Sequence, residues 1–305
     1  MRVLKISSVL ALWFVFQTLT CHASESKADD WRARASVADR DTYADSDTEE
    51  EVNFGREIAG RLLGQYKLST NVKLQKYVNL VGATLTQNCS RPELDFHFIV
   101  VDSSEINAYS TPGGYVFITT AVLSRMSNEA ELAGVLAHEI AHVTERHIVK
   151  ELSLKGTEKS AASSIAAMIG GASKSAEIAF SQAVDKAVDI LLRDGYKKED
   201  EMQADATAVV LCAFSGYDPS GLVTFLDKIG KVKSGVGKTY PVYDVRLATL
   251  QRAMSDEGIA DMKLALNTER FANAMKTDKK INLNPLDLAN PIDMIRKVIP
   301  GGAHD

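Results

Sequence analysis

The sequence predicts a predominantly helical α+β fold with one small β-sheet. Most segments between residues 56 and 253 carry apolar residues three and four positions apart, the period of amphipathic helices. Residues 94–120 differ, because they are rich in β-forming residues and hold a Pro-Gly-Gly turn signal. The chain has 305 residues, of which 45% are hydrophobic, and this is enough for one sizeable core.

Residues 1–23 predict a secretory signal peptide that is cleaved after Ala23. Two basic residues precede an apolar run at residues 9–16, which is too short to span a bilayer. The small residues before the cleavage point fit the preference of signal peptidase. A lipidated Cys21 is the alternative, although the preceding Thr-Leu-Thr is a poor lipobox.

Charge and cysteine content exclude some classes of partner. Loss of Arg2 and Lys5 with the signal takes the net charge from −5 to −7, which argues against a nucleic-acid partner. No later stretch is apolar over 18 residues, so we expect a mature chain that is soluble or peripheral to a membrane. Cys89 and Cys212 either pair in an oxidising compartment or stay as buried free thiols, and we favour free thiols.

Composition divides the rest of the chain into a leader, a core domain and a tail. Residues 24–50 are polar and acidic, and they predict a flexible, solvated leader. The core domain is expected over residues 51–265. Residues 266–305 hold three of the seven prolines and predict a C-terminal tail that wraps the core or hangs loose.

The first half of the core domain is expected to mix helices and strands. Amphipathic patterns predict helices at residues 56–67 and 71–88. Residues 94–101 alternate or run apolar and predict a strand. Residues 106–120 form two short β runs around Pro112-Gly113-Gly114, which predicts a hairpin.

The second half is expected to be helical. One long helix is predicted over residues 127–152, with Ser127 or Asn128 as its N-cap. Residues 155–176 are rich in Ala, Ser and Gly and predict a helical lid over the site. Residues 161–172 could instead touch a membrane surface, but we favour packing in the core or in the lid. Further helices are expected at residues 176–193, 201–216, 219–231 and 245–253.

The long helix carries a pattern typical of a metal site. His138 and His142 are four residues apart, so their rings leave the same helix face one turn apart. Two imidazole nitrogens at that spacing can converge on one Zn²⁺ at about 2.1 Å. Glu139 lies about 100° round the helix, from where it can reach a water on the metal. This is the H-E-x-x-H arrangement of zinc peptidases.

A catalytic zinc site needs a third protein ligand. Glu145 and Ile148 stand where the metzincin pattern requires glycine and histidine, so that class is excluded. His147 is five residues past His142, about 140° round a continuous helix, and is expected to point away as a structural or surface histidine. His97 in a strand and His304 in the tail are poorly placed.

A glutamate ligand is therefore favoured, and the segment Glu-Met-Gln-Ala-Asp supplies one. Glu201 and Asp205 are four residues apart on one helical face. Glu201 would bind the metal, and Asp205 would accept the N–H of a ligand histidine and fix its tautomer. The alternative is a solvated acidic turn at a helix start, which the helix dipole favours.

Three motifs resemble one family of enzymes. The segments NAYSTPGGYVFITTAVL, LAGVLAHEIAHVTERH and GYKKEDEMQADATAVVLCAFSGYDP have the order and spacing of the HtpX and CAAX-prenyl-protease type of zinc metallopeptidase. They are most similar to its secreted bacterial branch of BepA- and LoiP-like proteases. The resemblance covers residues 51–255. It implies a gluzincin fold, mostly helical, with a small β-sheet beside the active-site helix.

The resemblance also implies roles for individual residues. It makes His138, His142 and Glu201 the ligands of one zinc ion per chain and Glu139 the catalytic base. It further implies that an extended peptide lies against an edge-strand segment. The matching residues of that segment are Asn107, Ala108, Pro112, Gly113 and Gly114.

One position departs from the family pattern. In the segment KTYPVYDVR, Tyr240 stands where relatives carry a histidine near the metal, while Pro241 and Arg246 keep their places. The departure leaves open which group stabilises the oxyanion. We expect Tyr240 or Arg246 to do so together with zinc, because both can donate hydrogen bonds.

The expected activity is zinc-assisted hydrolysis of peptide bonds. The family branch implies unfolded or misassembled envelope proteins as substrates and the periplasm as location, with association with the outer membrane left open. The alternative is a chaperone-like assembly factor that binds envelope proteins with little or no cleavage. An assay of turnover with and without a chelator separates the two.

Overall fold

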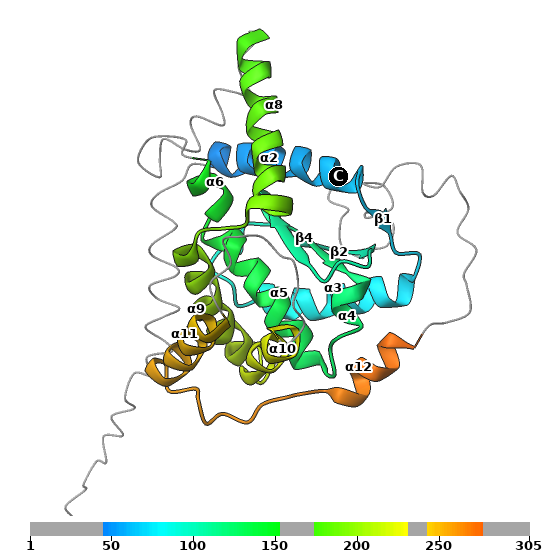
Figure 1. Cartoon of the computed structure of the whole chain (residues 1–305), viewed down its shortest axis with the longest axis vertical. Helices are drawn as coiled ribbons and strands as arrows, with labels where there is room; N and C mark the ends of the chain where they lie inside the picture. The colour runs from blue at the N-terminus through cyan, green and yellow to red at the C-terminus, as the bar shows by residue number, and fades with distance from the viewer. Residues whose placement is uncertain (1–44, 153–173, 231–242, 277–305) are drawn as a thin grey trace, which may run out of the picture.

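Figure 1 shows the computed structural model of the chain, which describes residues 45–152, 174–230 and 243–276. In this part of the chain, four strands form one sheet in the order β1-β2-β4-β3. β2 and β4 are parallel, and the two outer strands are antiparallel to their neighbours. The strands are β1 (Lys67–Leu68), β2 (His97–Asp102), β3 (Ala108–Thr111) and β4 (Tyr115–Thr119).

Helices surround the sheet and account for most of the described chain (Figure 1). The first are α2 (Asp45–Leu63), α3 (Val72–Thr86), α4 (Thr120–Leu123), α5 (Glu129–Thr144) and α6 (His147–Glu151). They are followed by α8 (Lys174–Asp189) with a π-helical turn at Ile190–Asp194, α9 (Lys198–Phe214), α10 (Ser220–Gly230), α11 (Tyr243–Asp256) and α12 (Thr268–Met275). The predominantly helical α+β fold that the sequence predicts is confirmed.

Both faces of the sheet are buried, which explains the nearly continuous apolar run in β2. Successive side chains of a strand point to opposite faces. Phe98 and Val100 therefore join the core on the side of α3 and α5, whereas Ile99 and Val101 join the core under α2 and α8. Figure 1 shows α2 and α3 on opposite sides of the strands. The central helix α5 is buried along its whole length.

The ordered core starts before the expected boundary at residue 51. Helix α2 begins at Asp45, inside the segment expected to be a flexible leader, while residues 24–44 lie outside the described chain. Glu51 is only 4% exposed and pairs with Arg91 over 2.7 Å and with Arg146 over 3.0 Å. Two buried arginines therefore hold the start of α2 against the core.

The predicted long helix over residues 127–152 is broken. Asn128 caps α5, with its side chain accepting a hydrogen bond from the Glu131 backbone N–H. The helix ends at Thr144, and Arg146 adopts a left-handed conformation (φ 55°) before α6 begins. That conformation costs a non-glycine residue roughly 1–2 kcal/mol, and the buried ion pair of Arg146 with Glu51 stabilises it. The single-helix prediction is wrong at this point.

The predicted hairpin is confirmed, with β3 and β4 joined by a 3₁₀ turn at Pro112–Gly114. Gly113 and Gly114 have positive φ values of 75° and 96°, which favour glycine. A Cβ atom at Gly113 would lie 2.6 Å from Val52 Cα, and one at Gly114 would lie 2.8 Å from the Asp95 carbonyl oxygen. Close packing on α2 and on the loop before β2 therefore requires both glycines.

The core also extends beyond the expected boundary at residue 265. Helix α12 lies in the segment expected to be a tail, and its Phe271 and Ala274 side chains are buried. Arg270 of α12 pairs with Glu129 at the start of α5. The rest of the expected tail, from residue 277, and residues 153–173 of the expected lid lie outside the described chain.

Two further expectations concern membranes and thiols. Among the described residues, no helix is both long enough and apolar enough to cross a bilayer. Cys89 and Cys212 are free thiols in the structure, and Cys212 is buried. The expectation of buried free thiols is therefore confirmed for Cys212, whereas Cys89 is partly exposed.

Candidate metal centre

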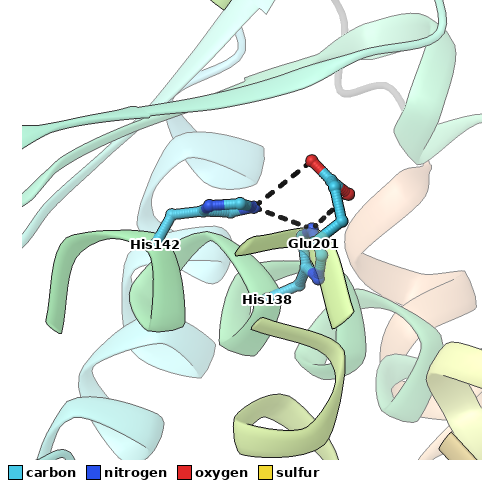
Figure 2. Close-up of side chains that lie close together, drawn as sticks. All are labelled: His138, His142 and Glu201. Atoms are coloured by element: carbon cyan, nitrogen blue, oxygen red, sulfur yellow. Dashed lines mark hydrogen bonds and ion pairs between the residues drawn. The ribbon is translucent and has the colours of Figure 1, made fainter. Parts of the chain in front are cut away.

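Three potential ligands converge between α5 and α9. Figure 2 shows the rings of His138 and His142 turned toward the carboxylate of Glu201. The Nε2 atoms of the two histidines are 3.1 Å apart. They lie 3.5 Å and 3.7 Å from the two carboxylate oxygens of Glu201. The sequence predicted this trio, and the structure brings it together.

Local helix geometry and helix packing produce the convergence. His138 and His142 are one turn apart on the last two turns of α5. Glu201 lies in the first turn of α9, which packs along α5. All three residues are nearly inaccessible to solvent, with exposed fractions of 8%, 3% and 2%.

The donor set fits a tetrahedral zinc ion. Ligand atoms about 2.1 Å from such an ion lie about 3.4 Å apart, close to the three measured separations. Glu201 Oε2 is a buried oxygen without a hydrogen-bond partner in the described chain. His138 Nε2 and Arg246 Nη1 face this oxygen over 3.5 Å and 3.6 Å, and a buried carboxylate oxygen that lacks a hydrogen bond favours a cation at a closer distance. Two imidazoles and one carboxylate leave a fourth position open, as catalytic zinc sites do.

The buried ion pair of Asp205 and Arg246 lies next to His138. Asp205 Oδ1 lies 3.0 Å from His138 Nδ1, as expected for an acceptor that fixes the tautomer. Arg246 of α11 donates to both oxygens of Asp205, over 2.8 Å and 2.6 Å. Burial lowers the pKa of His138, but hydrogen bonds with Asp205 and Glu201 outweigh burial and raise it to about 9. The two carboxylates therefore favour a positive charge in this part of the site, which a bound metal ion would supply.

His142 is held by partners that sequence reasoning missed. The ring of Tyr196 stacks on it, with ring centres 4.0 Å apart and planes inclined by 14°. His147 Nδ1 lies 2.8 Å from His142 Nδ1. The expectation that His147 points away is wrong, because the break at Arg146 turns α6 back toward the site. Burial lowers the pKa of His142 well below its usual value and that of His147 to about 4.

Glu139 is buried beside the ligands and faces the sheet. Its Oε2 accepts a 2.9 Å hydrogen bond from Ser110 Oγ of β3. Burial raises the pKa of Glu139 to about 6, although His138 and Ser110 oppose the shift. Ser110 was expected only as the end of the substrate-binding edge at residues 107–110, and its contact with Glu139 was not predicted, although the signal for it was present. It lies two residues after Ala108 in the edge strand and therefore shares its face.

A cavity of about 280 Å³ opens next to Glu139. Asn107 and Ala108 line it together with His138, Glu139 and Arg246. The remaining wall is largely apolar and comes from the loop before β3 and from α4, α5, α10 and α11: Ile106, Val122, Val135, Leu222, Phe225, Leu226, Ile229, Gly230 and Tyr243.

The other expected site residues lie elsewhere. Gly113 and Gly114 were expected to bind substrate, but they pack in the hairpin turn and do not line this cavity. Tyr240 lies outside the described residues. Arg246 borders the cavity, but two of its guanidinium nitrogens already donate hydrogen bonds to Asp205.

Comparison with known proteins agrees with this geometry. The family model described as peptidase family M48 matches residues 72–254. The chain belongs to peptidase family M48. The matched region contains the three converging side chains, Glu139 and Arg246, so the resemblance carried by the three sequence motifs is confirmed at the level of the family.

Several relatives are proteases by name. The chain is 31% identical over 186 residues to the beta-barrel assembly-enhancing protease of Escherichia coli (strain K12), a match covering 59% of this chain and 37% of that protein. It is 24% identical over 212 residues to metalloprotease YcaL of the same strain, covering 70% and 79%. It is 23% identical over 198 residues to metalloprotease LoiP, covering 62% and 74%. The chain thus spans little more than a third of the first of these relatives.

Proposed function

We propose that this chain is a zinc-dependent endopeptidase that cleaves extended segments of unfolded or misassembled cell-envelope proteins. The observation that carries the proposal is the convergence of His138, His142 and Glu201 around one point, with Glu139 buried beside them at a cavity. A purely structural zinc site typically has a closed, cysteine-rich set of four ligands and has no use for an adjacent base.

Each side chain of the site has a proposed role in the reaction. A zinc ion held by the three ligands supplies Lewis-acid activation of water and of the scissile carbonyl. Glu139 accepts a proton from the attacking water and returns it to the leaving amine. Burial raises the pKa of this carboxylate to about 6, which suits a group that both takes and gives a proton.

Two groups are proposed to stabilise the developing oxyanion. Arg246 borders the cavity, and its pairing with Asp205 holds the guanidinium in place beside His138. Tyr240 precedes α11 in the chain and can donate through its hydroxyl. Arg246 has a second role in this scheme, because it also holds the carboxylate that orients His138.

The sheet provides a proposed platform for the substrate. β3 is one of the two edge strands of the described sheet, and its first residue, Ala108, borders the cavity together with Asn107. An extended peptide can add to such an edge through main-chain hydrogen bonds, which requires an unfolded segment. The printed name of one relative refers to beta-barrel assembly. Together with the signal peptide expected at residues 1–23, this supports envelope proteins as substrates, and a periplasmic location with outer-membrane association left open.

A matched pair of glutamate variants tests the proposal. Glu139→Gln removes the base but keeps the shape, so we expect loss of casein degradation with zinc content unchanged. Glu177→Gln changes an exposed glutamate of α8 and should leave both unchanged. Casein degradation by Glu139→Gln at the wild-type rate would refute the role of the base.

A third variant separates the metal from the base. Glu201→Ala removes one of the three ligands, so we expect it to lose both zinc and activity. A wild-type chain that binds envelope proteins but degrades nothing, with or without a chelator, would favour the alternative function of an assembly factor. Retention of zinc by Glu201→Ala would assign the third ligand to another residue.

A further inference from the structure

The break between α5 and α6 places a third histidine of this region inside the site. In a continuous helix, His147 would lie about 140° away from His142. Instead, the left-handed Arg146 interrupts the helix, and His147 becomes the first residue of α6, fully buried. Its ring centre lies 4.9 Å from that of His142, with the planes inclined by 73°.

The contact is part of a chain of hydrogen bonds that links α5 to α9. His142 Nδ1 and His147 Nδ1 are 2.8 Å apart. His147 Nε2 lies 3.3 Å from Gln203 Oε1, and Gln203 Nε2 donates to Glu145 Oε2. Gln203 is two residues after Glu201 on α9, so the chain of contacts spans the two helices that supply the expected ligands.

Only one placement of protons satisfies this chain when His142 faces a metal ion. His142 Nε2 then offers its lone pair to the ion, so its proton is on Nδ1 and points at His147. His147 Nδ1 must accept that proton in a hydrogen bond, which leaves the proton of His147 on Nε2. There it meets the amide oxygen of Gln203, while the amide N–H of Gln203 meets the carboxylate of Glu145.

The two histidine ligands are therefore oriented by different chemistry. Asp205, a carboxylate, faces the Nδ1 atom of His138. A neutral imidazole faces the Nδ1 atom of His142. An acceptor in this position fixes the tautomer and ring orientation of a ligand histidine.

We propose that His147 is a positioning residue of the metal site: it accepts the Nδ1–H of His142 and so directs the Nε2 lone pair of His142 at the ion. This inference rests on the proposed function. It adds to it a residue that neither touches substrate nor binds the metal. Glu51 takes part indirectly, because its ion pair holds Arg146 in the left-handed conformation that aims His147 at His142.

Zinc affinity tests the inference, measured on the full chain by competition with a fluorescent chelator. His147→Phe keeps a ring but removes the acceptor, and we expect zinc binding about 10- to 100-fold weaker. His147→Gln restores an acceptor oxygen and should bind zinc close to the wild-type affinity. His97→Gln, a change in the half-buried histidine of β2, serves as the matched control and should have no effect.

The outcomes separate this inference from the proposed function. Equal zinc affinity of His147→Phe and His147→Gln, at any level, would overturn the role of His147 as an acceptor. If the wild-type chain binds zinc and degrades casein in that case, the proposed function stands. If the wild-type chain binds no zinc, both fall together.

A second measurement needs no variant that might fail to fold. A long-range ¹H–¹⁵N correlation spectrum of the zinc-loaded wild-type protein reports which ring nitrogen of each histidine carries the proton. We expect His147 to carry it on Nε2. A proton on Nδ1 of His147 would overturn the inference.

Discussion

Ser110 Oγ donates a hydrogen bond to Glu139 Oε2 over 2.9 Å, which ties the edge strand β3 to the central helix α5. Both side chains are buried. The strand proposed to bind substrate is thus the same strand that holds the proposed base. A peptide that adds to this edge would lie beside a carboxylate whose orientation is already fixed.

The first prediction concerns this hydrogen bond. Ser110→Ala leaves Glu139 without its donor, and one hydrogen bond contributes roughly 1–1.5 kcal/mol. We therefore expect casein degradation to slow about fivefold to tenfold, with zinc content unchanged. Ser124→Ala removes an exposed hydroxyl that caps only its own turn and is the matched control. Equal rates for the two variants would show that Ser110 does not support Glu139.

The second prediction compares a buried ion pair with an exposed one. Asp205 is fully buried and accepts two hydrogen bonds from Arg246, so Asp205→Ala removes the carboxylate that holds this buried cation. We expect a loss of about 3–5 kcal/mol in the free energy of unfolding. Asp185→Ala removes a pair with Arg61 in which both side chains are more than half exposed, and should cost no more than about 1 kcal/mol. Urea unfolding measures both, and similar losses would contradict the prediction.

The third prediction concerns pH and the docking of α12. Burial raises the pKa of Glu129, but hydrogen bonds from Arg270 and Tyr77 outweigh it and hold the pKa below the ordinary value of 4.5. The folded chain therefore binds this proton less readily than the unfolded chain. The contribution to stability is complete above about pH 4.5 and is lost as the pH falls through the lowered pKa of the folded state.

Urea unfolding of wild type and of Glu129→Gln between pH 7 and pH 3 checks this sign. The wild-type protein should be the more stable at neutral pH, and the difference should shrink below about pH 4.5 because the glutamine cannot titrate. The comparison isolates Glu129 from the other carboxylates, which both proteins share. A difference that stays constant across the range would contradict the assignment.

The fourth prediction concerns the apolar wall of the cavity. Peptides with leucine or phenylalanine beside the scissile bond should be cleaved faster than those with alanine or aspartate, by about tenfold to hundredfold in kcat/KM. Val135 lines the cavity, so Val135→Phe should fill part of it and favour the alanine peptide. Ile178→Phe, on the exposed face of α8, is the control. If Val135→Phe keeps the wild-type preference among these peptides, the cavity does not bind the side chain beside the scissile bond.

Local spacing was enough to predict the pair His138 and His142, and the resemblance to a known family joined Glu201 to it. Residues four apart share a helix face wherever a helix forms, so the histidine pair could be predicted from the sequence. Glu201 and Asp205 follow the same rule on α9. The fold class was predictable for a similar reason, since the helical and strand periods are properties of short segments.

Other parts of the site depend on contacts between distant segments. The sequence around Arg146 contains no glycine or proline to end a helix, and a continuous helix was therefore expected. The break is stabilised by Glu51, which lies 95 residues away in the chain, at the expected boundary between the leader and the core domain. His147 was consequently expected to point away from His142, which it contacts.

The sequence by itself determined the helix and strand periods, the metal-ligand spacing and the family. Only the tertiary structure decided where α5 ends, which strand residue holds Glu139, and that Gly113 and Gly114 lie away from the cavity. The physical reason is one of range. Periodicity acts over a few residues, whereas a left-handed arginine or a buried hydrogen bond is stabilised by partners that the chain brings together only when it folds.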